Sequence, residues 1–389
     1  MAAGDDVRPS RCRGRSSGRF AAGAVGVHGT TKGSGMWGKR NDMIVHAEEP
    51  FNAEPPPAAL AAQPVTPIEA FYSRNHGPFP DLDPASWRLR VDGLVDHELV
   101  LSLTDLQQRF TPRTELATLE CAGNRRVELL AVRDIPGQVP WGPATISTAE
   151  WTGVSLADVL AAAGLGADAA HVAFSAPDVS PGVGEPYGSS IPLPKACAGE
   201  VLLAWRMNGA PLPQIHGGPV RVVVPGYIGA RSVKWVQRIT LQALPSESYF
   251  QAEDYRLLPP DAAPGPGRGI SLGPLTMTSG ILYPDGDRLP AGPTDVVGYA
   301  FAAEGRTIVR VDVSLDGGRT WTQGAVDDPP SPWAWQLWHT TLDLPAGPAE
   351  ITARAWDDTG ATQPEFPASL WNPAGYDNNS WARVRIDVG

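Results

Sequence analysis

Between residues 65 and 250, the order of hydrophobic and polar positions predicts strands mixed with short helices. Residues 87–95 (WRLRVDGLV) alternate as a half-buried strand does, and the continuous β-branched run at 220–226 (VRVVVPG) predicts a strand buried on both faces. Residues 102–110 begin with Ser and carry Asp at the fourth position, which predicts a helix opened by a capping box. Residues 154–166 (VSLADVLAAAGLG) show an amphipathic helix pattern that stops at glycine.

A proline- and glycine-rich stretch at 257–269 (LLPPDAAPGPGRG) predicts a linker, and beyond it the pattern changes. Residues 306–326 form two alternating segments around Asp-Gly-Gly, which is the pattern of a β-hairpin. The alternation continues at 334–344 and 349–360. Strands of this spacing predict an immunoglobulin-like β-sandwich without its cysteine pair. The fold class that we expect is therefore α+β, with a mixed α/β domain followed by an all-β sandwich.

Four segments follow from these changes in pattern. We expect a disordered N-terminal extension, a mixed domain, a linker and a sandwich domain, with the boundaries 1–45, 46–258, 259–269 and 270–389. The start of the extension is rich in Arg, Gly and Ser, and Met36 or Met43 would each be a plausible translation start. Because this stretch has neither an apolar signal-peptide core nor twin arginines, we expect a cytoplasmic protein.

Composition excludes several classes of function. The 389 residues are 42% hydrophobic and 19% charged, as in a folded soluble protein, and the net charge is −11. No general basic field attracts phosphate, so we expect neither a nucleic-acid nor a membrane partner. No apolar run approaches the roughly 20 residues of a membrane helix. Three cysteines, Cys12, Cys121 and Cys197, give neither a disulfide framework nor the spacing of a zinc site.

One of these cysteines lies in residues 119–126 (LECAGNRR), beside two arginines. We expect the positive charge of Arg125 and Arg126 to lower the pKa of the Cys121 thiol. A thiolate is a soft metal ligand or a nucleophile, whereas a buried thiol is a small core residue. The residues alone leave all three roles open for Cys121.

Two further clusters hold polar residues next to glycine and proline. Residues 72–80 (YSRNHGPFP) form either a site or a proline turn with a solvated Arg and His. Residues 216–235 (HGGPVRVVVPGYIGARSVKW) place basic side chains around a buried strand and a glycine-rich turn, an arrangement that suits a phosphate. The residue orders of a Walker loop and of a dinucleotide-binding Rossmann turn are both missing from the sequence.

In this order along the chain, the clusters RNHGP, LECAGNRR and HGGPVRVVVPGYIGARSVKW, followed by EDYRLLPP (253–260), resemble the motifs of the sulfite oxidase family of molybdenum-cofactor oxidoreductases. The lead-in EEPFNAEPP (48–56) and the tail LWNPAGYDNNSW (370–381) fit the same family. The resemblance extends from about residue 46 to the C-terminus and is nearest to the plant-type enzyme, which lacks a haem domain. It implies a molybdopterin-binding domain of the sulfite oxidase fold and an immunoglobulin-like dimerisation domain.

The resemblance also implies roles for single residues. It makes Cys121 the thiolate ligand of molybdenum, with the pterin dithiolene supplying the other sulfur ligands. The residues that would hold the pterin and its phosphate are Asn75, His76, Asp178, His216, Arg221, Ser232 and Lys234. The residues that would line the substrate pocket are Arg74, Arg126 and Tyr255, joined by Trp141 if one residue is inserted in DIPGQVPW. One molybdenum cofactor per subunit, no haem, no flavin and a homodimer formed through the C-terminal domain are implied as well.

The implied chemistry is oxygen-atom transfer, which converts sulfite to sulfate and passes electrons to oxygen or an external cytochrome. One departure weakens the implied choice of substrate. The family's sulfite oxidases carry an arginine at the fourth position of a WNLRG-like stretch, whereas this chain has WNPAG with Ala374. A charged hydrogen bond contributes roughly 1.5–3 kcal/mol, so three alternatives are open. Sulfite would bind more weakly, another basic side chain would compensate, or another small oxo compound, such as nitrate or an S-oxide, would be the substrate.

Two hypotheses from other classes stay open at this point. A non-catalytic binding protein built on the sandwich is disfavoured because Cys121, His216, Arg221 and Lys234 are all present. A metal-free phosphate-handling enzyme is disfavoured because no general base accompanies the basic cluster. The leading expectation is a molybdenum enzyme that oxidises sulfite.

Overall fold

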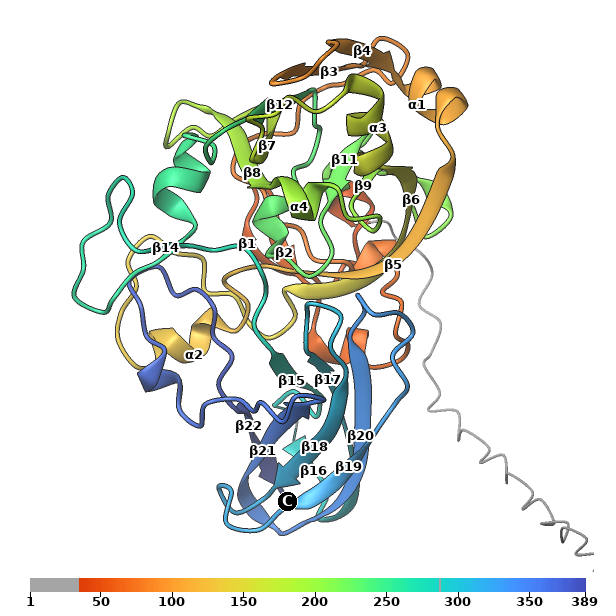
Figure 1. Ribbon diagram of the computed structural model, residues 1–389. Coiled ribbons are helices and arrows are strands. Elements are labelled where there is room, and N and C mark those ends of the chain that lie inside the picture. The colour runs from red at the N-terminus through yellow and green to blue at the C-terminus, as the bar shows by residue number, and fades with distance from the viewer. Residues whose placement is uncertain (1–34, 287) are drawn as a thin grey trace, which may run out of the picture. The chain divides into compact units, whose positions relative to one another are not determined.

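The computed structural model describes residues 35–286 and 288–389 (Figure 1). Most of the predicted disordered extension lies outside these residues, but its last part does not. Residues 35–45 contain a 3₁₀ turn at Met36–Gly38 and the start of strand β1 (Ile44–Ala47), so the predicted boundary at residue 45 is wrong for them. The physical reason is Lys39, which is 2% exposed and fastens the segment to the folded domain.

Two five-stranded sheets form the first domain. The first has the order β10-β9-β6-β5 with β11 beside β9, and the second has the order β4-β3-β12-β7-β8, in which only β12 and β3 are parallel. The strands are β3 (Arg88–Gly93), β4 (Leu99–Ser102), β5 (Pro112–Glu120), β6 (Ile146–Ser155), β7 (His171–Val179), β8 (Pro186–Pro192), β9 (Leu202–Met207), β10 (Ala210–Pro211), β11 (Arg221–Val223) and β12 (Arg238–Gln242). The predicted mixed domain is confirmed.

Four short α-helices connect these strands: α1 (Leu103–Arg109), α2 (Arg126–Leu130), α3 (Leu156–Ala163) and α4 (Leu193–Ala196). The capping box predicted for α1 is present, since Ser102 accepts from the Asp105 N–H and Asp105 accepts from the Ser102 N–H. Helix α3 ends at Gly164, whose φ of 74° lies in the left-handed region that glycine tolerates. No helix of the described residues is long and apolar enough to cross a membrane.

Eight strands build the C-terminal sandwich in the order β15-β17-β20-β19-β18-β21-β22-β16. Strand β15 also packs against β21 and β22 from the other end of this order, so the two ends of the strand order lie side by side (Figure 1). The strands are β15 (Thr278–Tyr283), β16 (Arg288–Leu289), β17 (Gly292–Phe301), β18 (Ile308–Ser314), β19 (Thr322–Val326), β20 (Gln336–Leu344), β21 (Gly347–Asp357) and β22 (Ala382–Val388). The predicted linker is the loop between two short paired strands, β13 (Arg256–Leu257) and β14 (Ile270–Ser271).

Arg125 joins the two domains. Its φ of 62° turns the chain after Cys121, and its side chain is 1% exposed. One guanidinium nitrogen, Nη1, donates to the carbonyls of Ser279 (2.9 Å) and Ser380 (2.7 Å), while Nη2 donates to Glu128 (2.7 Å). The arginine therefore connects the segment after β5 to two separate parts of the sandwich domain.

We predict that Arg125→Met lowers the free energy of unfolding by about 3 kcal/mol, because it removes a partly buried ion pair with Glu128 and a charged donor from three backbone carbonyls of the sandwich domain. Urea unfolding of the variant should show a lower midpoint than that of the wild type. Arg113→Met is the matched control, since Arg113 makes only a 3.6 Å surface pair with Asp158 and should shift stability by less than about 0.5 kcal/mol. Equal midpoints for the two variants would contradict the role given to Arg125.

Candidate functional site

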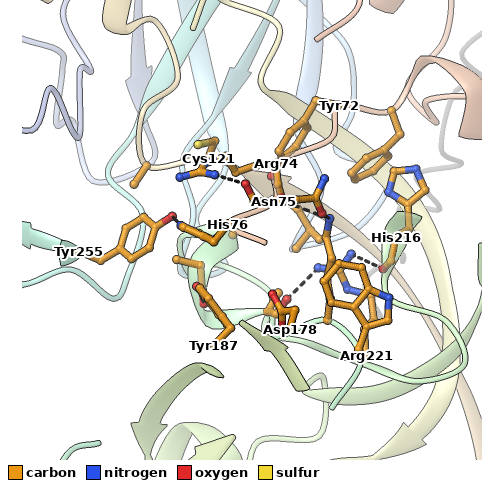
Figure 2. Close-up of a pocket in the computed structure, with 18 residues that line it drawn as sticks. Tyr72, Arg74, Asn75, His76, Cys121, Asp178, Tyr187, His216, Arg221 and Tyr255 are labelled. Carbon is orange, nitrogen blue, oxygen red and sulfur yellow. Dashed lines mark hydrogen bonds between the residues drawn. The ribbon is translucent and has the colours of Figure 1, made fainter. Parts of the chain in front are cut away.

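A cleft with about 650 Å³ of free space, part of it continuous with solvent, lies in the first domain. Ten of the eleven predicted site residues line it: Arg74, Asn75, His76, Cys121, Asp178, His216, Arg221, Ser232, Lys234 and Tyr255. Figure 2 shows Cys121 and Tyr255 toward one side of the cleft and His216 and Arg221 toward the other. Segments far apart in the sequence are thus brought to one cavity.

The ends of secondary-structure elements supply most of these side chains. Cys121 follows β5 directly, and Asp178 is the penultimate residue of β7. His216 closes the 3₁₀ turn Gln214–His216, and Arg221 opens β11. Residues at such positions are held by a rigid scaffold while their side chains remain free to contact a ligand.

The N-terminal hairpin of β1 and β2 (Asn52–Glu54) fixes Asn75. The Asn75 backbone N–H donates to Asn52 Oδ1 (2.7 Å), and its side-chain Nδ2 donates to the Phe51 carbonyl (2.5 Å). Its Oδ1 accepts a hydrogen bond from Lys234 Nζ (2.7 Å). The lead-in motif at 48–56 therefore supports one wall of the cleft.

The basic end of the cleft holds buried cations that bond to neutral oxygens. Arg221 donates to the carbonyls of His216 (2.9 Å) and Ser232 (2.9 Å), and Lys234 donates to the Ile215 carbonyl (2.9 Å). Burial lowers the pKa of Arg221 to about 10 and lowers that of Lys234 well below its usual value. An anionic ligand would offset this cost, because it favours the charged form of both side chains.

Asp178 is the one carboxyl group among the residues that line the cleft. Burial raises its pKa to about 7, although the charge of Lys234 acts in the opposite direction. Its Oδ1 atom is buried and has no hydrogen-bond partner in the described protein. An acceptor left in this way is expected to bind a donor, here an N–H group of a ligand in the cleft.

The Cys121 thiol is 6% exposed, and its Sγ accepts a weak hydrogen bond from the Gly123 N–H (3.5 Å). Burial raises the pKa of the thiol, and the charges of Arg126 and Arg74 offset this only in part. The expected lowering by the neighbouring charge is present for Arg126, but burial, which the sequence did not show, outweighs it. A metal ion would reverse the balance, because a coordinating thiol loses its proton.

Tyr255 and His76 form a neutral hydrogen-bonded pair at the side of the cleft near Cys121. Tyr255 Oη lies 2.9 Å from His76 Nε2. Burial and then the charge of Arg74 hold the pKa of His76 well below its usual range, and burial raises the pKa of Tyr255. The Tyr255 ring stacks on Tyr376 at 5.3 Å, and Tyr376 donates to Asp254 Oδ1 (2.9 Å). Tyr255 therefore keeps its hydroxyl proton.

Two of the residues implied for the substrate pocket do not line the cleft. Arg126 is 2% exposed and donates to the carbonyls of Gly375 (3.1 Å) and Val139 (2.9 Å). Its guanidinium lies so close to Gly123 that a Cβ there would meet it at 2.5 Å. Trp141 is fully buried, with its ring edge-on to His46 at 4.7 Å. Arg126 is thus occupied by contacts within the protein, whereas the buried Trp141 Nε1 has no hydrogen-bond partner among the described residues.

Sequence reasoning missed three residues of this region. Tyr72 lines the cleft, and Tyr187 lines it with its ring stacked on His76 at 4.9 Å. Lys39 contacts His216 from outside the cleft, with its Nζ 2.5 Å from His216 Nε2. Tyr72 adjoins the RNHGP motif and could have been included, but nothing in the local sequence singles out Tyr187 or Lys39.

Comparisons with known proteins match both domains. Residues 76–250 match the oxidoreductase molybdopterin binding domain, and residues 275–389 match the Mo-co oxidoreductase dimerisation domain. The chain is 38% identical to the sulfite oxidase of Arabidopsis thaliana in an alignment that covers 94% of this chain and 98% of the plant protein. This chain belongs to the sulfite oxidase family of molybdenum-cofactor oxidoreductases.

Other members of the sulfite oxidase family and its fold add detail. Mitochondrial sulfite oxidase of Homo sapiens is 44% identical over 368 residues, which cover 89% of this chain and 66% of the human protein. Identity is therefore higher to the human enzyme, whereas the plant enzyme is matched over more of its length. The crystal structure of the sulfane dehydrogenase SoxCD from Paracoccus pantotrophus has a TM-score of 0.77 at 30% identity, covering 88% of this chain and 86% of that chain.

The residues of the cleft fit the family's molybdopterin cofactor. Cys121 provides a soft thiolate at one side, the unpartnered Asp178 Oδ1 can accept from pterin N–H groups, and the basic end suits a phosphate. Among the described residues, no group of three or more His, Cys, Asp or Glu side chains could hold a metal ion. The protein's ligand to the metal would be Cys121, and His216, Arg221 and Lys234 would hold the anionic end of the cofactor.

We predict that Cys121→Ser retains the pterin, because the other residues of the cleft still hold it, but loses the thiolate-to-metal charge-transfer absorption of the purified protein. Turnover should fall at least about a hundred-fold, since ligand changes exceed the effect of outer-shell changes. The matched control is Cys197→Ser, which removes the exposed free cysteine and should change neither property. An unaltered visible spectrum in Cys121→Ser would contradict the assignment of this ligand.

Proposed function

We propose that the protein oxidises sulfite to sulfate by oxygen-atom transfer at a molybdenum centre coordinated by Cys121. The observation that carries this proposal is the cleft itself, which combines a thiol at one side with buried cations and a single carboxyl group. The family's cofactor, when bound, supplies a metal that exchanges an oxygen atom and two electrons with the substrate. The identity to sulfite oxidases over most of this chain supports sulfite as the substrate.

The protein's own residues would bind and orient the oxyanion. Arg74 lines the cleft with Cys121, and its charge favours a small anion near the metal ligand. Tyr255 retains its proton, and when the neutral His76 donates from Nε2–H to the Tyr255 oxygen, that proton is left for a hydrogen bond to a ligand at the same side. Charge and a fixed hydroxyl donor stabilise developing negative charge on an oxygen better than solvent does.

A second candidate keeps the cofactor and changes the substrate to another small oxo compound, such as nitrate or an S-oxide. Ala374 motivates it, because this side chain packs against the hydrophobic core and offers no charge to an oxyanion. Two residues further on, the Tyr376 ring lies 5.2 Å from the Arg126 guanidinium carbon, and the hydrogen bonds of this arginine go to backbone carbonyls. The substrate side would thus have fewer free cations than a site with an arginine at position 374.

We also propose that the protein is a homodimer formed through residues 270–389, with oxygen or an external cytochrome as electron acceptor. The match of residues 275–389 to a dimerisation domain supports the dimer. Half-buried rings of Trp321, Trp356 and Trp381 surround Arg354 on this domain, at 3.8, 4.5 and 5.2 Å from its guanidinium carbon. Such aromatic and arginine side chains are frequent in protein interfaces.

We predict that the purified protein reduces an artificial electron acceptor when sulfite is added. Its kcat/KM for sulfite should exceed its kcat/KM for the reduction of nitrate or an S-oxide with an artificial electron donor. Steady-state assays of all three substrates test this directly. Efficient sulfite turnover would remove the second candidate, whereas turnover of nitrate or an S-oxide without sulfite oxidation would contradict the first.

Ala374→Arg refines this test. If sulfite is the substrate, the added guanidinium should lower KM for sulfite about ten-fold, since a charged hydrogen bond contributes roughly 1.5–3 kcal/mol. Ala374→Met is the matched control, because it adds comparable bulk without charge. Equal KM values in the two variants would show that position 374 does not contribute charge to the substrate.

A further inference from the structure

Lys39 is a buried side chain that contacts His216, a residue of the cleft, from a segment outside both matched domains. It lies before β1, and its side chain is 2% exposed. Its Nζ atom lies 2.7 Å from the Ile68 carbonyl, 2.8 Å from the Phe71 carbonyl and 2.5 Å from His216 Nε2. These three partners account for all three N–H groups of an ammonium.

The hydrogen bonds of Lys39 decide which nitrogen of His216 carries the proton. A lysine ammonium donates and cannot accept, so when Lys39 is charged the Nε2 atom that it contacts accepts. Burial and then the charge of Lys39 hold the pKa of His216 well below its usual range, so the ring is neutral. A neutral imidazole that accepts at Nε2 carries its proton on Nδ1.

The orientation of the His216 ring is fixed at the same time. Its plane stands edge-on to Phe71, with 5.2 Å between the ring centroids, and Lys39 bonds to the carbonyl of that same residue. His216 lines the cleft beside Arg221 and Lys234, at the end that suits a phosphate. Lys39 thus holds the ring of a residue that lines the basic end and lies behind that ring.

We propose that Lys39 is a positioning residue of the cofactor site: it fixes the Nδ1–H tautomer of His216 and adds a positive charge behind it for the phosphate of the pterin. The inference rests on the proposed cofactor chemistry and extends the site to the segment before β1. Burial lowers the pKa of Lys39 to about 7, and a phosphate bound nearby would favour its charged form.

The simpler interpretation is that Lys39 only fastens residues 35–47 to the domain through two carbonyls. The two interpretations differ in what they predict for His216. A fastening residue affects stability alone, whereas a positioning residue also changes the His216 tautomer and the retention of the cofactor. Outer-shell partners of ligands typically change affinity 10- to 100-fold.

The test compares the full-length wild type, Lys39→Met and Arg40→Met, each produced in a host that makes the pterin cofactor. Arg40 is the matched control, because it is the neighbouring cation and pairs only with Asp42 at the surface. Molybdenum and pterin per chain are measured during dialysis, and ¹⁵N-histidine NMR at pH 6 reports the tautomer of His216. A His216→Ala background shows whether the effect of Lys39 passes through the histidine.

We expect Lys39→Met to lose the cofactor about ten-fold faster than the wild type, and Arg40→Met to retain it. In Lys39→Met the His216 proton should move to Nε2, which is left beside the vacated carbonyls, and in His216→Ala the Lys39 substitution should have a much smaller effect. Wild-type retention by Lys39→Met, or an unchanged tautomer, would overturn the inference. A wild-type protein without molybdenum and pterin would instead overturn the proposed function.

Discussion

Buried positive charge without a matching buried negative charge is the constraint on which this structure depends. Arg74, Arg221 and Lys234 line one cleft, and Lys39 lies directly behind it. Their hydrogen bonds go to carbonyls, an amide and an imidazole, which satisfy donors but do not neutralise charge. Asp178, the one carboxyl group of the lining, has a pKa raised to about 7 and offsets this charge only in part. An anionic cofactor supplies the missing negative charge.

The rest of the fold serves to hold these cations and the thiol in place. Cys121 directly follows strand β5, and the two arginines that come after it point in different directions. The Arg125 side chain crosses to the sandwich domain, while Arg126 turns toward Gly375 and packs on Tyr376. A single short motif thus positions the proposed metal ligand and fixes the contact between two domains. This explains why an acidic protein has two adjacent arginines beside an isolated cysteine.

The sequence was sufficient to predict the main helices and strands and most of the predicted site residues that line the cleft, because both depend on local patterns or on recognisable motifs. The capping box at Ser102 and the buried strand β11 follow from short-range chemistry and are present as expected. Contacts between distant segments were not predictable. Lys39 bonds to His216 across 177 residues, and nothing near Lys39 indicates that it is buried. The net direction of the thiol pKa was not predictable for the same reason, because the burial that outweighs the charge of Arg126 is a property of the folded chain.

The substrate question and the cofactor question are separable in this protein. Identity to sulfite oxidases and the cationic cleft support the same cofactor, whereas Ala374 bears only on the oxyanion. The most direct test of the central claim is anomalous X-ray diffraction from crystals of the purified protein, recorded at the molybdenum absorption edge. We expect one strong peak per chain within bonding distance of Cys121 Sγ, with pterin density extending to His216. A peak elsewhere, or pterin density that avoids the basic end of the cleft, would contradict it.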